Sequence, residues 1–350
     1  MGLCISKPRT GGADYQYGGG RQPTAGTSTP QSAQSSPARS PSSYHLGNLP
    51  RRARNKARAL EDAVKNSAVQ HTHPQLAAYA DAVLRAAGTD GVNPEISTLD
   101  GENIETLANT YNARHPDLNL KCFPWAELFL EKLYTSSEPA WRALFRLTTQ
   151  NRHRIAADIR THADGGKTVL LLESALSHSW DPNKKDYKFI AGIQSLQRNI
   201  ETNFRNCKMA VIDVEAQKAN IGCTLFSLNF LLNAYQKDDL FNSLHERLNE
   251  NGRCFEGHES EVINGMEYIE GTKILPPIFY KHAQSRGTIE DFVKHQPDHQ
   301  NSNVSTSRSG PRETLQERAQ NFRVTRGERS YNMSIEASRM RKIRKAIEDL

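Results

Sequence analysis

The segment 209–235 constrains the fold more than any other part of the chain. It opens with an apolar run, MAVIDVE, which is typical of a buried strand, and it closes with a largely apolar helical stretch, CTLFSLNFLLNAY. The short polar stretch QKANIG separates the two. Since both the strand and the helix need other elements to cover them, we expect an α/β core around this segment.

A second segment, 153–174, predicts a β-hairpin. The residues HRIAADIR alternate in character, ADGG is typical of a turn, and KTVLLLES indicates a buried strand. Helical periodicity predicts further helices over 51–88 with a break at Pro74, near 102–113, near 124–134, and in two pieces over 313–348. By contrast, 257–271 and 286–311 look like loops.

Positive charge is concentrated near the two ends of the chain. Residues 1–58 hold nine Lys and Arg but one acid, and 312–345 hold ten Lys and Arg against four acids, in a chain of net charge +6. Such segments bind anionic membranes, polyphosphates or nucleic acid, or they remain solvated. Neither segment carries a nucleic-acid recognition motif, so we expect no nucleic-acid partner.

The composition of residues 1–48 predicts disorder, because a stretch rich in Gly, Ser, Thr, Pro and Gln cannot bury enough apolar surface. No apolar run in the sequence is long enough to span a bilayer, and the N-terminus lacks the apolar region of a secretory signal peptide. The five cysteines are an odd number without C-x-x-C spacing. They indicate reduced thiols and no metal site.

Three residues are candidates for nucleophilic catalysis. Cys223 follows a glycine at the start of the apolar helix, where unpaired N–H groups and the helix dipole favour the thiolate. His153 begins the predicted hairpin and Glu173 ends it, so the two could share a hydrogen bond that orients the imidazole. Taken singly, such a cysteine is more often a buried core residue, and Asp158 or Asp213 could support the histidine instead of Glu173.

Several separate blocks together resemble the YopJ/HopZ family of acetyltransferase effectors. They contain His153 with Asp158, Glu173, Gln217 with Cys223 and Phe226-Ser227-Leu228, and Tyr280-Lys281-His282. The HopZ branch of plant pathogens is also similar in its N-terminal Met-Gly with a nearby Cys, a P-x-L-N-L-K string from Pro116 to Lys121, and an FRV-x-R segment from Phe322 to Arg326. The order and spacing of these blocks over roughly residues 50–348 make the resemblance specific.

The resemblance implies a protein acetyltransferase with a Cys–His–Glu triad. Cys223 would take the acetyl group from acetyl-CoA, with His153 as general base and Glu173 as the residue that orients it. Gln217 matches a residue that helps form the oxyanion hole in the wider class of Ulp1-like cysteine peptidases. The acetyl group would then pass to Ser, Thr or Lys of host proteins, and Lys281 matches the lysine that the family autoacetylates.

The resemblance also implies activation by inositol hexakisphosphate, a eukaryotic metabolite. Such a polyanion needs several Arg and Lys side chains, because guanidinium groups pair phosphate through two hydrogen bonds. The candidates from matching segments are Arg114, Lys121, Arg318, Arg323 and Arg326. Further candidates, chosen because they are basic and lie in a predicted helix, are Lys56 and the cluster Arg51, Arg52 and Arg54.

The implied fold is an α/β, Ulp1-like cysteine-peptidase core, with a mixed sheet flanked by helices, and a helical regulatory lobe built from both ends of the chain. Its parts are a disordered tail with lipidation and secretion signals (1–48), the N-terminal part of the lobe (49–135), the catalytic core (136–285), a flexible loop (286–311) and the C-terminal part of the lobe (312–350). Two alternatives stay open. A peptidase of ubiquitin-like modifiers would use the same triad without the basic lobe, and a non-catalytic adaptor would need no intact triad.

The first six residues, MGLCIS, fit the motif for N-myristoylation. Removal of Met1 would expose Gly2, and Cys4 could be palmitoylated to give the second signal that stable anchoring requires. Bacteria lack this modification, so it would take place in the host. We therefore expect a protein that the bacterium secretes into a host cell, where it lies at the plasma membrane and in the cytoplasm.

Overall fold

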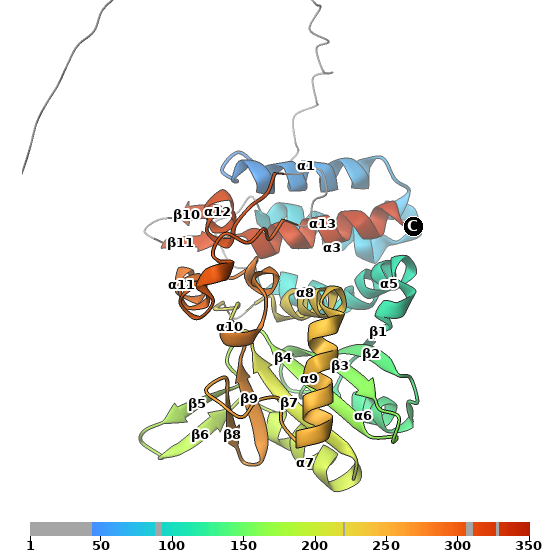
Figure 1. Cartoon of the computed structure of the whole chain (residues 1–350). Coiled ribbons are helices and arrows are strands. Elements are labelled where there is room, and N and C mark those ends of the chain that lie inside the picture. Colours follow the sequence, from blue (N-terminus) through green and yellow to red (C-terminus); the bar gives the residue numbers. More distant parts are fainter. Residues whose placement is uncertain (1–43, 88–92, 220, 306–310, 327–328) are drawn as a thin grey trace, which may run out of the picture. The chain divides into compact units, whose positions relative to one another are not determined.

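A mixed seven-stranded sheet forms the centre of the protein in its computed structural model (Figure 1), which describes residues 44–350 except 88–92, 220, 306–310 and 327–328. The strand order is β1-β2-β3-β4-β7-β9-β8. The strands are β1 (Leu120–Phe123), β2 (Ala140–Arg146), β3 (Arg154–Thr161), β4 (Lys167–Glu173), β7 (Cys207–Asp213), β8 (Ser260–Ile263) and β9 (Met266–Glu270). Strands β1–β2, β4–β7 and β7–β9 pair in parallel, and the other pairs are antiparallel. The predicted mixed sheet is confirmed.

The hairpin of β3 and β4 lies in the middle of this sheet, as the sequence predicts. Its register pairs Ala156 with Leu172, and the turn closes through a hydrogen bond from the His162 amide to the Gly166 carbonyl. Both strands are buried on their two faces, which explains why β4 is almost continuously apolar. The register brings the start of β3 and the end of β4 to the same edge of the sheet.

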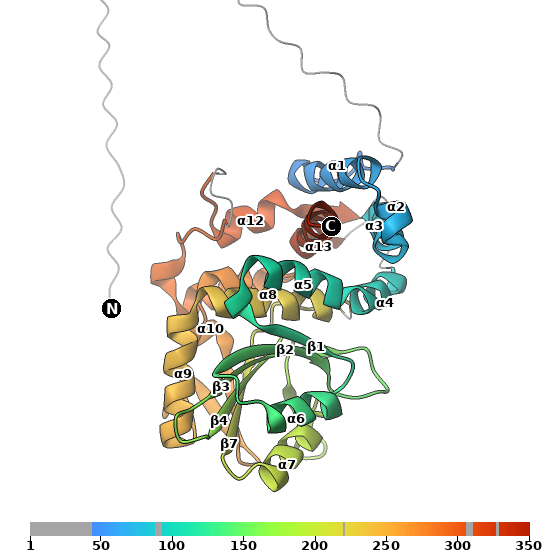
Figure 2. The same ribbon diagram turned by 90° about the vertical axis from the view of Figure 1, so that its right-hand side faces the viewer.

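Each face of the sheet has its own apolar core. Helices α6 (Ala126–Thr135) and α7 (Ile193–Asn203) cover one face and contribute to a core that includes Phe129, whose ring stacks on Phe145 at 4.1 Å. Helix α8 (Cys223–Gln236) covers the other face, and α9 (Asp238–Asn251) packs beside β4 and β7 (Figure 2). Helix α8 is buried on nearly all sides, which explains why most of its residues are apolar.

A layer of helices from both ends of the described chain lies over α8 (Figure 1). It comprises α1 (Arg51–Lys65), α2 (Val69–Thr72), α3 (Pro74–Ala87), α4 (Pro94–Glu102), α5 (Ile104–Arg114), α12 (Leu315–Asn321) and α13 (Ser334–Glu348). Helix α13 packs against α1, α3 and α5, and Arg339 forms a buried bidentate ion pair with Asp100. One apolar core continues from this layer to the sheet, so the helical layer is not a separate folding unit.

Some sequence predictions about loops and boundaries are wrong. The segment 257–271 contains the whole β8–β9 hairpin, whose turn has positive φ at Asn264 and Gly265, and 286–311 begins with α11 (Arg286–His295). Strands β10 (Arg323–Arg326) and β11 (Arg329–Asn332) interrupt the predicted helices over 313–348. Strand β1 and helix α6 pack with the sheet and not with the helical layer, so the predicted boundary at residue 135 divides elements that belong together.

The remaining elements are short. They are the β5–β6 hairpin (His178–Asp181 and Asp186–Phe189), α10 (Gly271–Ile274), and three 3-10 turns at Pro116–Leu118, Pro277–Tyr280 and Pro297–His299. The β5–β6 hairpin is a separate two-stranded sheet that lies beside β8 and β9 (Figure 1).

Candidate active site

His153 and Glu173 meet where β3 begins and β4 ends. The Nε2 atom of His153 lies 2.7 Å from Oε2 of Glu173, whose carboxylate is fully buried. The other carboxylate oxygen, Oε1, accepts hydrogen bonds from the Ala175 amide at 2.9 Å and the Ser174 hydroxyl at 3.3 Å. These bonds fix the carboxylate, which in turn fixes the plane of the imidazole and leaves Nδ1 as its second functional nitrogen.

Cys223 is the first residue of α8. The preceding Gly222 has φ of 100°, a conformation that L side chains rarely adopt, which permits the sharp entry into the helix. The Cys223 thiol is 5 % exposed and donates to the carbonyl of Arg152 at 3.8 Å. Since Arg152 directly precedes His153, the sheet edge and the helix start bring thiol and imidazole together.

The electrostatics of this group favour a charged imidazole. Burial opposes the charge, but the Glu173 carboxylate and the Cys223 thiol outweigh burial and raise the pKa of His153 to about 10. At neutral pH the imidazole is therefore protonated. An imidazolium beside a thiol favours the nucleophilic thiolate.

The two other acids considered for the histidine lie elsewhere. Asp158 is fully buried and pairs with Arg142 at 2.8 Å. Asp213 accepts hydrogen bonds from the backbone and the hydroxyl of Ser177 at 3.0 and 2.8 Å. Of the three candidate acids, Glu173 is the one that contacts the imidazole.

Gln217 braces the loop in front of Cys223. Its Nε2 donates to the carbonyls of Ala219 at 2.6 Å and Ile221 at 3.3 Å, and its Oε1 accepts from the Ser174 hydroxyl at 2.7 Å. The amide would have to exchange these partners to act directly on an oxyanion. The first N–H groups of α8, which have no acceptor within the helix, are further donors beside the thiol.

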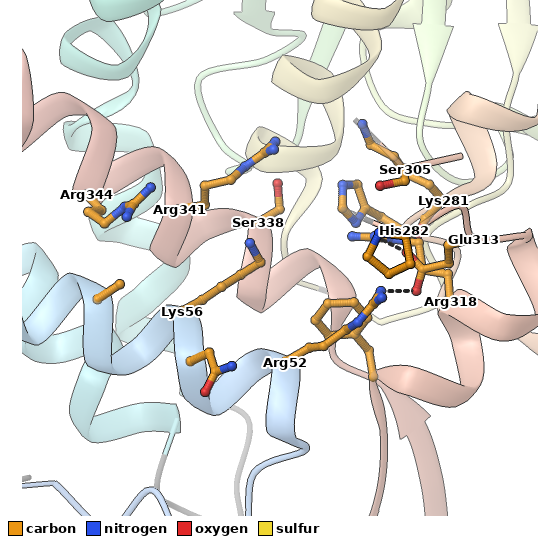
Figure 3. Close-up of a pocket in the computed structure, with 14 residues that line it drawn as sticks. Arg52, Lys56, Lys281, His282, Ser305, Glu313, Arg318, Ser338, Arg341 and Arg344 are labelled. Carbon is orange, nitrogen blue, oxygen red and sulfur yellow. Dashed lines mark hydrogen bonds and ion pairs between the residues drawn. The ribbon is translucent and has the colours of Figure 1, made fainter. Parts of the chain in front are cut away.

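A cavity of about 400 Å³ between α1, α12 and α13 gathers basic side chains (Figure 3). The cations that line it are Arg52, Lys56, Lys281, Arg318, Arg341 and Arg344, and the one carboxylate among the described lining residues is Glu313. We call this cavity the basic pocket. Glu313 accepts hydrogen bonds from Arg52 on α1 and, at 3.0 Å, from Arg318 on α12. An excess of cations over one carboxylate makes it a site for a polyanion.

Burial in the basic pocket disfavours the protonated form of its lysines. Burial, followed by the neighbouring Arg341 and Arg318, lowers the pKa of Lys56 to about 8. The same causes lower the pKa of Lys281, which is 5 % exposed, well below its usual value. A bound polyanion would remove this penalty, because opposite charge favours the protonated amines.

The sequence model of the YopJ serine/threonine acetyltransferase family matches residues 76–345, a span that contains His153, Glu173 and Cys223. The chain belongs to this family. It is 25 % identical over 316 residues to the acetyltransferase HopZ1a of Pseudomonas syringae pv. syringae, which covers 80 % of this chain and 82 % of HopZ1a. It is 32 % identical over 221 residues to a serine/threonine-protein acetyltransferase of Sinorhizobium fredii, which covers 61 % and 79 %, and 20 % identical over 247 residues to YopJ of Yersinia pestis, which covers 70 % and 80 %.

Solved structures place the fold in the same group. The crystal structure of HopZ1a in complex with IP6 aligns with a TM-score of 0.72 at 22 % identity, over 85 % of this chain and 98 % of that one. An AvrA variant solved with IP6 and CoA aligns with a TM-score of 0.59 at 18 % identity, over 83 % and 98 %. The predicted fold class is thereby confirmed.

Several of the basic residues predicted to bind a polyphosphate do not line the basic pocket; these are Arg51, Arg54, Arg114, Lys121 and Arg323. Arg114 forms a surface ion pair with Asp349, and Lys121 pairs with Glu138 at 3.1 Å. Arg323 lines a different cavity, and Arg326 is the last residue of β10. These residues match the YopJ/HopZ pattern in sequence, but Arg114, Lys121 and Arg323 have partners or surroundings outside the basic pocket. Of the residues predicted to bind the polyphosphate, Arg52, Lys56 and Arg318 line the pocket. Lys281, predicted as the autoacetylated lysine, lines it as well.

Arg341 and Arg344, which complete the basic pocket in this YopJ-family chain, are not among the residues predicted from the sequence. They lie three residues apart on α13, as Arg52 and Lys56 lie four apart on α1, so each helix presents its two cations on one face. This spacing was the signal that could have identified them. The predicted lipidation residues Gly2 and Cys4 lie outside the described residues.

Proposed function

We propose that this YopJ-family chain transfers acetyl groups from acetyl-CoA through a Cys223 acetyl-enzyme to serine, threonine or lysine residues of host proteins. The observation that carries this proposal is the 2.7 Å contact between His153 and Glu173 next to the thiol that starts α8. The HopZ1a and YopJ relatives bear the name of serine/threonine-protein acetyltransferases, which supports the same chemistry here.

In the proposed first step, the Cys223 thiolate attacks the thioester carbonyl of acetyl-CoA. The new C–S bond forms a tetrahedral oxyanion, which backbone N–H groups at the start of α8 stabilise, with Gln217 holding the loop. The C–S bond to CoA then breaks, and the His153 imidazolium protonates the departing thiolate. In the second step His153 takes the proton of an acceptor hydroxyl or amine, which attacks the acetyl-enzyme and releases Cys223.

We assign acetyl-CoA to a cavity of about 370 Å³ beside the loop that leads to Cys223. Ile221, two residues before the nucleophile, lines it together with the apolar side chains of Val83 on α3 and Met340 on α13. Lys218 on the same loop supplies a positive charge for the CoA phosphates. HopZ1a was crystallised with both IP6 and CoA, which supports a site for the cofactor in this fold.

We assign inositol hexakisphosphate, the proposed host activator, to the basic pocket. Its six cations come from α1, α12, α13 and the segment at Lys281, so one polyanion would join both ends of the helical layer. The HopZ1a and AvrA structures that align with this chain were solved with IP6. Lys281 is the proposed autoacetylation residue. Because it is buried in this pocket, transfer to its amine requires the pocket to open.

We further propose that the protein is secreted by the bacterium and acts at the host plasma membrane through acylation of Gly2 and Cys4. Among the described residues, no helix has the length and apolar character needed to cross a bilayer. Incorporation of an alkyne-labelled myristate in host cells, compared between wild type and Gly2→Ala, tests this assignment. Equal labelling of the two proteins would exclude it.

Incubation of purified protein with radiolabelled acetyl-CoA, with and without inositol hexakisphosphate, tests the proposed activity. We expect label on the wild-type protein that depends on the polyphosphate and disappears in Cys223→Ala. Cleavage of a ubiquitin-like substrate without acetyl transfer would identify a peptidase. A Cys223→Ala protein that keeps full activity in host cells would identify an adaptor.

A further inference from the structure

A third cavity, of about 330 Å³, has the opposite charge to the basic pocket. It lies where the β5–β6 hairpin meets β8 and β9 (Figure 1). Five carboxylates line it, those of Asp213, Glu215, Glu259, Glu261 and Glu270, against the single lysine Lys273. We call it the acidic cavity. Acidic side chains therefore predominate in this cavity, although the net charge of the chain is +6.

The carboxylates of the acidic cavity are only partly neutralised. Lys273 binds Glu270 at 2.6 Å, and Lys218 lies 3.3 Å from Glu215. Asp213 has only an imidazole beside it, that of His178 at 3.4 Å, and Glu261 accepts a hydrogen bond from the Tyr187 hydroxyl. Glu259 makes no hydrogen bond or ion pair through its side chain with the part of the chain that the structure describes. Burial raises the pKa of Asp213, as expected of a carboxylate without a full counter-charge. A cation in the cavity would be attracted by several of these groups at once.

A buried phenol in the wall of the cavity points independently to a ligand. Tyr268 on β9 is 3 % exposed and lines the cavity, yet its hydroxyl has no hydrogen-bond partner among the described residues. Its ring packs on that of His178, with centroids 4.5 Å apart. Buried hydroxyls are nearly always paired, so this oxygen is suited to accept a hydrogen bond from a group that enters the cavity.

Exposed apolar side chains lie on the elements that form the acidic cavity, as in a protein-docking surface. Leu176, which lines the cavity, is 46 % exposed, and Trp180 on β5 and Val262 on β8 are 54 % and 49 % exposed. Trp180 packs edge-on against Tyr187 at 5.1 Å, so the β5–β6 hairpin presents a rigid aromatic surface. Apolar side chains around a charged hollow favour a protein partner over a free ion.

The acidic cavity shares its walls with the candidate active site. Asp213 on β7 lies in register with Glu173 on β4, and Leu176 follows Glu173 by three residues. Glu215 precedes Gln217, the residue that braces the nucleophile loop, by two. A group bound in the cavity would therefore be held by the same two loops that position the triad.

We infer that the acidic cavity binds a lysine or arginine side chain of the acceptor protein and so places a neighbouring acceptor hydroxyl at Cys223. This inference rests on the proposed acetyltransferase function and adds a rule for substrate choice. The charged head would pair with Glu259 and Asp213 and donate to the Tyr268 oxygen, while the exposed apolar side chains contact the flanking residues.

A positional-scanning library of serine and threonine peptides tests this inference. Each flanking position carries arginine, its uncharged analogue citrulline, or glutamate, and the full-length protein is assayed with acetyl-CoA and inositol hexakisphosphate. We expect arginine at one fixed distance from the acceptor to raise kcat/KM about tenfold over citrulline. The double variant Glu259→Lys/Glu261→Lys should prefer glutamate there, and Tyr268→Phe should lose part of the arginine preference.

Glu250→Lys is the matched control, because Glu250 is an exposed carboxylate on α9 outside the cavity, and it should keep the arginine preference. Acetyl loading of Cys223, measured by intact mass for every protein, separates the two levels of the argument. No loading of the wild type would overturn the acetyltransferase proposal itself. A loaded enzyme that uses arginine and citrulline peptides equally, that acetylates no member of the library, or whose preference survives the double charge reversal would overturn the inference.

Discussion

Replacing Glu173 with glutamine removes the charge that holds His153 protonated while keeping the shape of the side chain. In the wild type, Glu173 and Cys223 together raise the pKa of His153 from 6.5 to about 10 against the effect of burial. A shift of this size corresponds to about 5 kcal/mol of differential interaction. Glu173 acts on the imidazole both through its charge and through the 2.7 Å hydrogen bond.

The Glu173 charge is the largest of the causes that raise this pKa, and we assign it roughly two of the pH units. Its loss should leave the imidazolium predominant at pH 7 but lower its population, and with it the rate of acetyl-enzyme formation, about tenfold near pH 9. The pKa of His153 should fall at the same time. The alkaline limb of the pH–rate profile, where the imidazolium loses its proton, should therefore move from near pH 10 toward neutrality.

Rapid-quench mixing with acetyl-CoA, followed by intact mass measurement across pH 6–10.5, gives both quantities. Glu102→Gln serves as the control, because Glu102 is an exposed carboxylate at the end of α4 and makes no contact with the imidazole. Cys223→Ala supplies the blank. A Glu173→Gln enzyme with an unshifted alkaline limb and a rate at pH 9 within threefold of wild type would refute the electrostatic argument.

Three further predictions address the helical layer. Asp100→Asn leaves the buried Arg339 without its carboxylate, so we expect a loss of about 3–5 kcal/mol in the free energy of unfolding by urea; a loss below 1 kcal/mol would contradict the assignment. Arg344→Ala should weaken the binding of inositol hexakisphosphate about tenfold, as measured by calorimetry. Arg114→Ala should leave the affinity unchanged, because Arg114 pairs with a surface carboxylate. The opposite pattern would support the motif-based prediction. Lys56 has a pKa of about 8 in the folded protein and a higher one in the unfolded chain, so the unfolded state binds more protons between about pH 8 and 10.5. This residue therefore makes the stability of the fold rise with pH over that range. Thermal melts of Lys56→Met should lack that contribution.

The centre of the fold and the candidate triad were predictable because local patterns specify both. Continuous apolar residues in β4 required a strand buried on both faces, and the ADGG turn set the hairpin that brings His153 to Glu173. The glycine before Cys223 marked the helix start. What no spacing specified was the distance between hairpin and helix, because it depends on how α8 packs across the sheet.

The errors have equally physical causes. The β8–β9 hairpin was taken for a loop although Asn264-Gly265 is a strong turn signal, because its strands are short and carry several charged residues. Helix α11 was missed although Ile289 and Phe292 lie three apart on its buried face. The polyphosphate candidates drawn from matching segments, such as Arg114, differ from the residues that line the basic pocket, because a one-dimensional match does not reveal which basic side chains turn toward a common cavity.

The packing of α1 against α13 bears on the order in which the chain folds. These are the first and last helices that the structure describes, so their contact closes a very long chain segment, and the loop-closure entropy of such a contact slows its formation. The basic pocket exists only once this contact is made, since both helices supply its cations. A polyanion that binds there therefore stabilises, by mass action, molecules in which α1 and α13 have docked over those in which the two helices are apart.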